Sequence, residues 1–229
     1  MDESDTCIHF LHIVHLDAYP IGYIGENASS EHTTVAQTNT ITESSRPVWH
    51  AIQTMNWKDY NRPECKRKDN NCHTPTYTEV RSMVWITIAG GANGFFFYSV
   101  YDIAKNPDID SHAEWNVLSK VAREVDRFAP ILLSTSLRDP TVDGGHPAWL
   151  MLRSHRTNAT SCYVFAVSDG RGAGTVTLRP ALPLPSSKIG AVMIESNDEV
   201  GRARPVVGTD RVSFTSRVEE MVAFHIMFV

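Results

Sequence analysis

The sequence predicts an α/β domain followed by an all-β domain. Residues 47–57 form an apolar run typical of a buried strand, residues 77–89 have the pattern of a helix, and residues 95–101 form an aromatic strand. Two buried strands joined by a helix make a right-handed parallel unit, in which ligand-facing residues lie at the carboxyl ends of the strands. Towards the C-terminus, short strand-like runs alternate with turn residues, as in an antiparallel sandwich. We therefore expect domains at residues 1–138 and 139–229.

Composition and charge are those of an ordinary globular protein. The 229 residues are 42% hydrophobic and 21% charged, with a net charge of −5 and interspersed signs. The densest basic run, Lys66-Arg67-Lys68, is followed directly by Asp69 and reads as a solvated loop. No apolar run approaches the ~20 residues that span a bilayer. We therefore expect neither a nucleic-acid partner nor a membrane partner.

Signals for cellular location point in two directions. The N-terminus, Met1-Asp-Glu-Ser-Asp5, is acidic, whereas a secretory signal begins with basic and then apolar residues. Asn27 and Asn158, however, each begin a glycosylation acceptor pattern of the kind found in exported proteins. The sequence therefore leaves two locations open: the protein is extracellular or in the secretory pathway, or it is not exported.

The first predicted strand, residues 9–17, ends at Asp17-Ala-Tyr-Pro-Ile-Gly22, where a proline and a glycine stop regular structure. His9, His12 and His15 lie in this run and invite a metal-site hypothesis. On a strand His12 faces away from the other two, and no Cys or carboxylate cluster completes a set of ligands. We therefore expect no metal.

The strand at residues 47–57 is followed by a polar loop, residues 58–75, which is too rich in charge, Asn and Pro to form a regular element. Cys65 and Cys72 lie within this loop and could close a small disulfide. The two other cysteines, Cys7 and Cys162, have no evident partner in the sequence.

A capped helix follows the loop. Thr76-Tyr-Thr-Glu79 has the form of a capping box, in which side chains at both ends serve free backbone N–H groups. The helix is expected to stop at Ala89, because Gly90-Gly91 permits a left-handed turn. The aromatic strand at residues 95–101 comes next, and Asp102 lies just past its predicted end.

A second capping box, Ser111-His-Ala-Glu114, begins an amphipathic helix that Pro130 is expected to end. The apolar positions recur at helical spacing and are Trp115, Leu118, Ala122, Val125 and Phe128.

In the all-β part, six strands are predicted at residues 148–155, 161–167, 175–179, 189–194, 212–216 and 221–228. The glycine-rich stretch at residues 169–174 lies between two of these strands and has no helix behind it to bind an anion. A hairpin turn is therefore favoured over a phosphate loop, and no cofactor is expected.

Four motifs occur in a consistent order: Asp17-Ala-Tyr-Pro-Ile-Gly22, Arg46-Pro-Val-Trp-His-Ala-Ile-Gln53, Pro75-Thr-Tyr-Thr-Glu-Val-Arg-Ser-Met83 and Gly91-Ala-Asn-Gly-Phe-Phe-Phe-Tyr-Ser99. In this order and spacing the chain, over about residues 16–229, resembles the second half of a glycoside hydrolase (β/α)8 barrel and the β-sandwich that commonly follows it. The resemblance implies a partial TIM barrel made of the last three strand–helix units. It also implies carbohydrate as the ligand and a secretory or extracellular location.

The resemblance raises a question about catalysis. Many of these enzymes keep a proton-donating Glu at the end of barrel strand four, which this chain does not contain, and a nucleophilic Glu at the end of strand seven. Gln53 occupies the strand-seven position, and its amide cannot act as a carboxylate nucleophile. Asp17 and Asp102 are the acids at predicted strand ends and are the candidate catalytic pair. A structural role, holding a loop or capping a turn, is equally open for each.

Aromatic side chains at the strand ends are the candidate sugar-binding groups. Flat apolar rings with polar edges can stack on sugars, and such residues here are Tyr19, Trp49, Trp57, Tyr98 and Tyr101. Trp49 is in mid-strand and is expected in the core. Trp57 and Tyr98 are preferred as sugar contacts, with Gln53 donating hydrogen bonds to hydroxyl groups.

Three functional hypotheses follow. The first is a glycoside-hydrolase-like protein with a carbohydrate cleft at the strand ends, weakly active or inactive alone because the strand with the usual acid/base is absent. The second is a non-catalytic carbohydrate-binding or interaction module. The third is one half of a split or truncated hydrolase, which a second chain or an upstream segment would complete.

Overall fold

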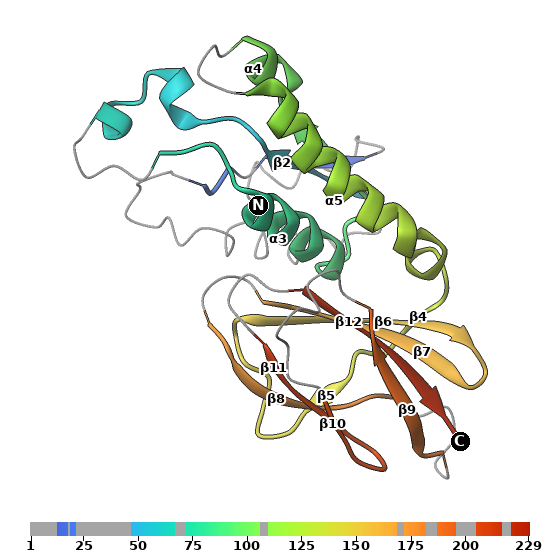
Figure 1. Cartoon of the computed structure of the whole chain (residues 1–229). Coiled ribbons are helices and arrows are strands. Elements are labelled where there is room, and N and C mark those ends of the chain that lie inside the picture. Colours follow the sequence, from blue (N-terminus) through green and yellow to red (C-terminus); the bar gives the residue numbers. More distant parts are fainter. Residues whose placement is uncertain are drawn as a thin grey trace, which may run out of the picture. The chain divides into compact units, whose positions relative to one another are not determined.

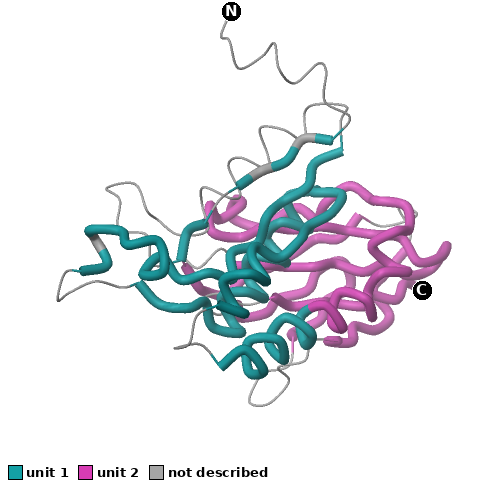
Figure 2. The backbone as a smooth tube through the Cα atoms, turned by 90° about the horizontal axis from the view of Figure 1, so that it is seen from above, with its two compact units in different colours: residues 1–121 teal, residues 122–229 magenta. Residues whose placement is uncertain are grey.

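The structure is a computed structural model that describes residues 13–17, 19–21, 47–66, 72–105, 110–168, 172–181, 187–195, 205–216 and 221–229. Of the residues singled out in the sequence, Cys7, His9, His12 and Asn27 lie outside the described residues. The chain forms two compact units, residues 1–121 and 122–229, shown in two colours in Figure 2. The change from one unit to the other falls inside helix α5 (Ser111–Leu132). The domain boundary expected at residues 138 and 139 stays a prediction.

Unit 1 contains a three-stranded parallel sheet in the order β1-β2-β3. Its strands are β1 (Val14–Asp17), β2 (Val48–Gln53) and β3 (Gly94–Tyr98). Asp17 pairs with Ala51, and Gln53 pairs with Tyr98. The prediction that these segments lie side by side in one direction is confirmed. β2 ends at Gln53 and is shorter than the predicted strand, and Trp57, the last residue of that prediction, begins the 3-10 helix η1 (Trp57–Tyr60).

Helix α3 (Tyr77–Ala89) has the predicted limits and connects β2 to β3. The capping box is complete: Thr76 Oγ1 accepts from the Glu79 N–H at 3.4 Å, and Glu79 Oε2 accepts from the Thr76 N–H at 2.7 Å. His73 Nε2 lies 2.9 Å from Glu79 Oε1 and adds a second contact to the same carboxylate. Gly91, with φ of 91°, supplies the left-handed residue that ends the helix.

The predicted strand at residues 95–101 is wrong at its C-terminal end. β3 ends at Tyr98, and Val100–Lys105 forms the short helix α4. Ser99 Oγ accepts a hydrogen bond from the Asp102 N–H at 3.2 Å, so the serine acts as a cap and starts a helix at once. Asp102 and Tyr101 therefore lie on a helix that follows the strand.

Helix α5 begins and ends differently from the prediction. Asp110 Oδ1 accepts from the N–H groups of His112 and Ala113 at 3.0 and 3.1 Å, so Asp110, rather than Ser111, caps the helix. Pro130 does not end α5, which continues to Leu132. Pro130 lacks a backbone N–H, and the loss of this one donor is tolerated in the last turn of the helix. The Leu133 N–H still donates to the Ala129 carbonyl at 2.9 Å.

The predicted apolar face of α5 is only partly buried. Leu118 and Phe128 are 3% and 1% exposed, whereas Trp115 is 57% exposed. In unit 2 the Phe128 ring packs edge-to-face on Phe165, with ring centroids 5.3 Å apart. No helix in the described part of the chain is long and apolar enough to cross a membrane.

Unit 2 consists of two antiparallel sheets (Figure 1). The five-stranded sheet has the order β4 (Ser136–Leu137), β6 (Leu150–Asn158), β7 (Ser161–Ser168), β12 (Met221–Phe228) and β9 (Ile189–Ile194). The four-stranded sheet has the order β10 (Val206–Val207), β11 (Val212–Ser216), β8 (Gly174–Arg179) and β5 (Thr141–Val142). One apolar core draws on both sheets, with Val164 and Phe224 from the first and Leu178 and Phe214 from the second.

The hairpin predicted around residues 169–174 is wrong. β7 pairs with β6 and β12, whereas β8 pairs with β11 and β5, so the chain changes sheets between β7 and β8. Every residue of β7 is buried, and both of its edges are already occupied by β6 and β12. A hairpin partner therefore has no free edge on β7, a condition that the local sequence does not reveal.

Candidate functional site

One face of the parallel sheet in unit 1 carries exposed aromatic side chains. The register aligns His15 with Trp49 and Gly94 in one row, and Asp17 with Ala51 and Phe96 in the next. Side chains alternate along a strand, so these rows and Tyr98 share one face, which we call the aromatic face. On the opposite face of β2, Val48, His50 and Ile52 are at most 1% exposed.

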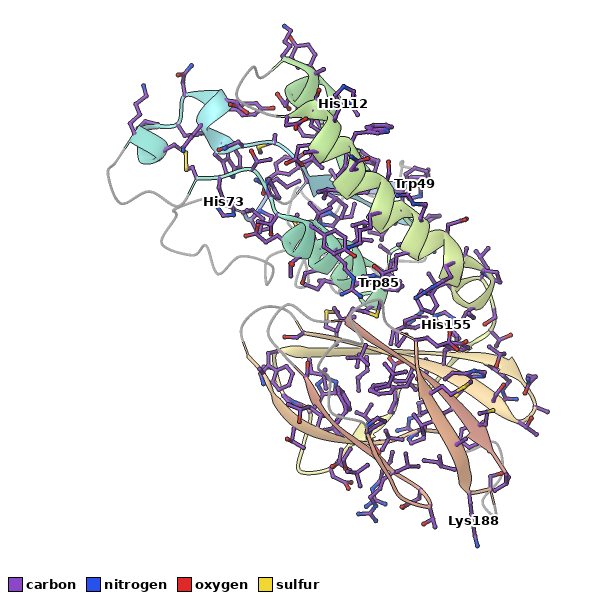
Figure 3. The ribbon with its side chains drawn as sticks, viewed as in Figure 1. Trp49, His73, Trp85, His112, His155 and Lys188 are labelled. Carbon is purple, nitrogen blue, oxygen red and sulfur yellow. A yellow bond between two sulfur atoms is a disulfide. The ribbon has the colours of Figure 1, made fainter. Side chains whose placement is uncertain are left out.

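The expectation that Trp49, which is labelled in Figure 3, lies in the core is wrong, because the residue is 40% exposed. Phe96 and Tyr98 on the same face are 37% and 38% exposed. The indole ring of Trp49 lies against Gly94, where an added Cβ would come within 2.8 Å of it. Glycine at position 94 therefore makes room for the indole on the aromatic face.

Four aromatic rings gather beyond the carboxyl ends of β1, β2 and β3. They belong to Tyr19, Trp57, Tyr60 and Tyr98, and we call them the aromatic cluster. Tyr19 stacks on Tyr98, with ring centroids 5.2 Å apart and planes 23° apart. The Trp57 ring meets Tyr19 edge-on at 6.2 Å, and its Nε1 donates to the Tyr19 carbonyl at 3.2 Å. Residues from three separate segments are thus brought together.

Tyr60 is a member of the cluster that the sequence reasoning missed. It is 41% exposed, and its ring centroid lies 6.0 Å from that of Trp57. Both residues belong to η1, which Asn56 caps by accepting from the Lys58 N–H at 3.0 Å. Residues three apart lie above one another in a 3-10 helix. The Asn cap and the spacing Trp-x-x-Tyr could therefore have predicted from the sequence that Tyr60 lies beside Trp57.

Arg62 also lies at the cluster and was missed. Its guanidinium carbon is 5.0 Å from the centroid of the Trp57 ring, within range of a cation–π interaction. The side chain extends from the segment between η1 and η2 (Pro63–Lys66). Helix η2, which follows Arg62, is tied to the chain before α3 by the disulfide between Cys65 and Cys72, the pair expected from the sequence.

The two candidate acids each accept a hydrogen bond from a tyrosine of the cluster. Asp17 Oδ1 accepts from the Tyr19 hydroxyl at 3.1 Å and lies 3.2 Å from His15 Nε2. Asp102 Oδ2 accepts from the Tyr60 hydroxyl at 2.9 Å and also from the Ser99 hydroxyl.

The two tyrosine hydroxyls remain protonated donors in this arrangement. Burial, together with the Asp17 carboxylate, raises the pKa of Tyr19. Burial and the hydrogen bond to Asp102 raise the pKa of Tyr60 in the same way. Each phenol therefore keeps its proton in place against a carboxylate oxygen.

Gln53 is completely buried and bonds to the backbone. Its Oε1 accepts from the Ile21 N–H at 2.8 Å, and its Nε2 donates to the carbonyls of Ile21 and Met55 at 2.9 and 3.0 Å. Both amide protons have carbonyl partners, so the amide positions the chain around Tyr19 instead of making the expected contact with sugar hydroxyls. It holds the residues that follow β1 against the end of β2.

The structure thus brings Asp17, Tyr19, Trp57, Tyr98 and Asp102 to one end of the parallel sheet. Tyr101 lies on α4 and is 61% exposed, with Lys105 Nζ 4.1 Å from its ring centroid. Within the described residues, no group of three His, Cys, Asp or Glu side chains is placed to hold a metal ion.

Comparisons with known proteins find only distant likeness. No family model and no curated protein matches the chain. An α-amylase from Geobacillus thermoleovorans, solved in complex with acarbose, aligns with a TM-score of 0.47 and 11% identity over 85% of this chain and 42% of that one. The α-amylase from H.orenii aligns with a TM-score of 0.45 and 8% identity over 93% of this chain and 49% of that one. The chain spans less than half the length of either amylase.

Proposed function

We propose that this protein is a glycoside-hydrolase-like chain that binds carbohydrate at the aromatic cluster and hydrolyses it weakly or not at all. In this proposal residues 1–138 form three strand–helix units of an open barrel, and residues 139–229 form a β-sandwich. The ligand is bound at the carboxyl ends of the parallel strands, the position at which such folds bind substrates.

The observation that carries the proposal is the composition of the cluster. Rings of Tyr19, Trp57, Tyr60 and Tyr98 stand together with polar edges, and Tyr60 and Tyr98 are 41% and 38% exposed. Sugar rings present apolar C–H faces and a rim of hydroxyl groups, which match aromatic faces and nearby acceptors. The carboxylates of Asp17 and Asp102 supply such acceptors beside the rings.

The same hydrogen bonds argue against efficient hydrolysis. Glycoside hydrolysis uses two carboxyl groups, one of which donates a proton to the leaving group. Asp17 accepts from Tyr19, and Asp102 accepts from both Tyr60 and Ser99, so oxygens of both carboxyl groups are already bonded to protein donors. Gln53, at the position of a nucleophile in the family that the sequence resembles, cannot replace either acid.

Binding is tested on a glycan array, followed by calorimetry with each glycan that is retained. Trp57→Ala is expected to weaken binding by about two- to tenfold or more, because an aromatic contact contributes about 0.5–1.5 kcal/mol in addition to the apolar area that it buries. Trp115→Ala is the matched control, since Trp115 is an exposed tryptophan on α5 outside the cluster. No binding to any glycan, or equal loss in both variants, would contradict the proposal.

Turnover is tested with a panel of aryl glycosides. Little or no release is expected from the chain alone. Substantial release that disappears in Asp17→Asn would overturn the inactive part of the proposal and identify Asp17 as a catalytic acid.

A second candidate is one half of a hydrolase completed by further strand–helix units. It is favoured by the aromatic face, where Trp49 and Phe96 are 40% and 37% exposed, and by the sheet edges, since β1 and β3 each pair with one strand among the described residues. Co-expression with a chain that supplies five strand–helix units tests this candidate. Restored glycosidase activity is its specific consequence, and failure of the two chains to associate would count against it.

A further inference from the structure

We propose that the sugar recognised at the aromatic cluster carries a carboxylate, as a hexuronic acid does, and that Arg62 binds this group. The inference rests on the proposed carbohydrate-binding function and names the chemical class of its ligand.

The geometry of Arg62 supports this role. The side chain is exposed, and its guanidinium lies over the Trp57 ring at 5.0 Å from the ring centroid. A guanidinium stacked on an aromatic ring is held in place while the N–H groups at its edges remain directed outward. These N–H groups form a planar fork that matches the two oxygens of a carboxylate.

The described surroundings leave this fork available. Within the described residues, no hydrogen bond or ion pair engages the Arg62 guanidinium, and its contact is with the Trp57 ring. The two acids that are bonded into the cluster have other donors, because Asp17 is bonded to Tyr19 and Asp102 to Tyr60. A carboxylate on a bound sugar would therefore not displace an existing partner among these residues.

The charge of the surrounding sequence favours the same ligand. Between Trp57 and Cys72 the chain carries five basic residues, Lys58, Arg62, Lys66, Arg67 and Lys68, against three acidic ones, Asp59, Glu64 and Asp69. The difference, five minus three, is +2, whereas the whole chain has a net charge of −5. A stretch of sequence with an excess of positive charge favours anionic ligands over cationic ones.

The test compares ligands that differ only in charge. Trigalacturonate and triglucuronate are each titrated against the protein beside their own methyl esters, which keep the sugar skeleton but lack the negative charge. At low salt, at least one acid is expected to bind about tenfold more tightly than its ester, which is the effect of a charge-assisted bidentate contact. This difference in affinity is expected to disappear as the salt concentration is raised.

Two variants distinguish a specific contact of Arg62 from the general effect of positive charge in its segment. Arg62→Gln is expected to reduce the difference between acid and ester to less than about twofold. Lys66→Gln removes an exposed positive charge of the same segment and is expected to preserve most of the difference. Thermal unfolding of both variants checks that each is folded as the wild type is.

Each outcome decides a different claim. Binding of acid and ester with equal affinity, still sensitive to Trp57→Ala, overturns the carboxylate assignment and leaves the carbohydrate-binding function intact. A difference that survives in Arg62→Gln overturns the role of Arg62. Tighter binding of a trisaccharide that carries sulfate but no carboxylate than of either hexuronate overturns the choice of a carboxylate. Binding of no saccharide overturns both the inference and the proposed function.

Discussion

The Tyr60 hydroxyl donates a 2.9 Å hydrogen bond to Oδ2 of Asp102 and so joins η1 to the first turn of α4. The two residues are 42 positions apart, and the carboxylate also accepts from Ser99 at the end of β3. One carboxylate therefore holds together the segment that carries Trp57 and Tyr60 and the strand end that carries Tyr98. The arrangement of the aromatic cluster depends on this contact.

Removing the Tyr60 hydroxyl is expected to loosen the cluster. Tyr60→Phe keeps the ring but loses the hydrogen bond to the Asp102 carboxylate. Because this hydrogen bond is partly exposed to solvent, the free energy of unfolding should fall by only about 1 kcal/mol. Affinity for a glycan should fall with it, because Trp57 and Tyr98 are less firmly positioned. Chemical denaturation and calorimetry measure the two effects. Tyr101→Phe, on the exposed side of α4, is the control and should leave glycan affinity unchanged.

Placing a carboxylate at position 53 is expected to destabilise unit 1 in a pH-dependent way. In Gln53→Glu, a fully buried carboxylate would face the carbonyls of Ile21 and Met55, which are acceptors and cannot donate to it. The penalty at neutral pH should be about 2 kcal/mol or more, since a buried charge loses its partners.

The direction of the pH effect in Gln53→Glu follows from linkage. The introduced carboxyl group would titrate above its unfolded value of ~4.3, so the folded state binds the proton more tightly. Stability relative to wild type should therefore recover below about pH 4 and be lost as pH rises. Denaturation curves of the variant and the wild type from about pH 3 to about pH 8 measure this difference in stability. Asn116→Asp, an exposed amide-to-acid change on α5, should show no comparable trend.

The capping box of α3 is expected to contribute measurably to stability. Thr76→Ala removes the hydroxyl that accepts from the Glu79 N–H, and the loss should be about 1 kcal/mol. Thr78→Ala is the matched control, because Thr78 is exposed inside the same helix and alanine is favourable there. Urea denaturation of the two variants should separate them; equal stability would show that the cap has no net effect.

Glu114 is expected to reduce stability at neutral pH. Its Oε2 is buried without a hydrogen-bond partner among the described residues, and burial raises the pKa of Glu114. A carboxyl whose pKa is raised on folding costs stability once pH exceeds its unfolded value of ~4.3. Glu114→Gln should therefore be more stable than wild type at about pH 7, by about 1 kcal/mol, and equally stable near pH 3. An equal difference at both pH values would exclude titration of Glu114 as the cause.

Short-range patterns in the sequence determined several elements correctly. The limits of α3 follow from Thr76, Glu79 and the glycines after Ala89, all of which act within one turn of the helix ends. The strands Ile189–Ile194, Val212–Ser216 and Met221–Phe228 were predicted at their observed limits. Their patterns of apolar and turn residues are local, so no knowledge of neighbours is needed to find them.

Contacts between distant segments were decided only by the tertiary structure. The partners of β7, the exposure of Trp49, the backbone hydrogen bonds of Gln53 and the membership of Tyr60 in the cluster all depend on such contacts. The end of β3 at Tyr98 and the start of α5 are each accompanied by a side chain that accepts from a backbone N–H of the following helix, Ser99 in the first case and Asp110 in the second. A side chain's type limits which bonds it can form, but packing decides which partner lies within hydrogen-bonding distance. For this reason the candidate acids were identified from sequence, while their hydrogen bonds to Tyr19 and Tyr60 were not.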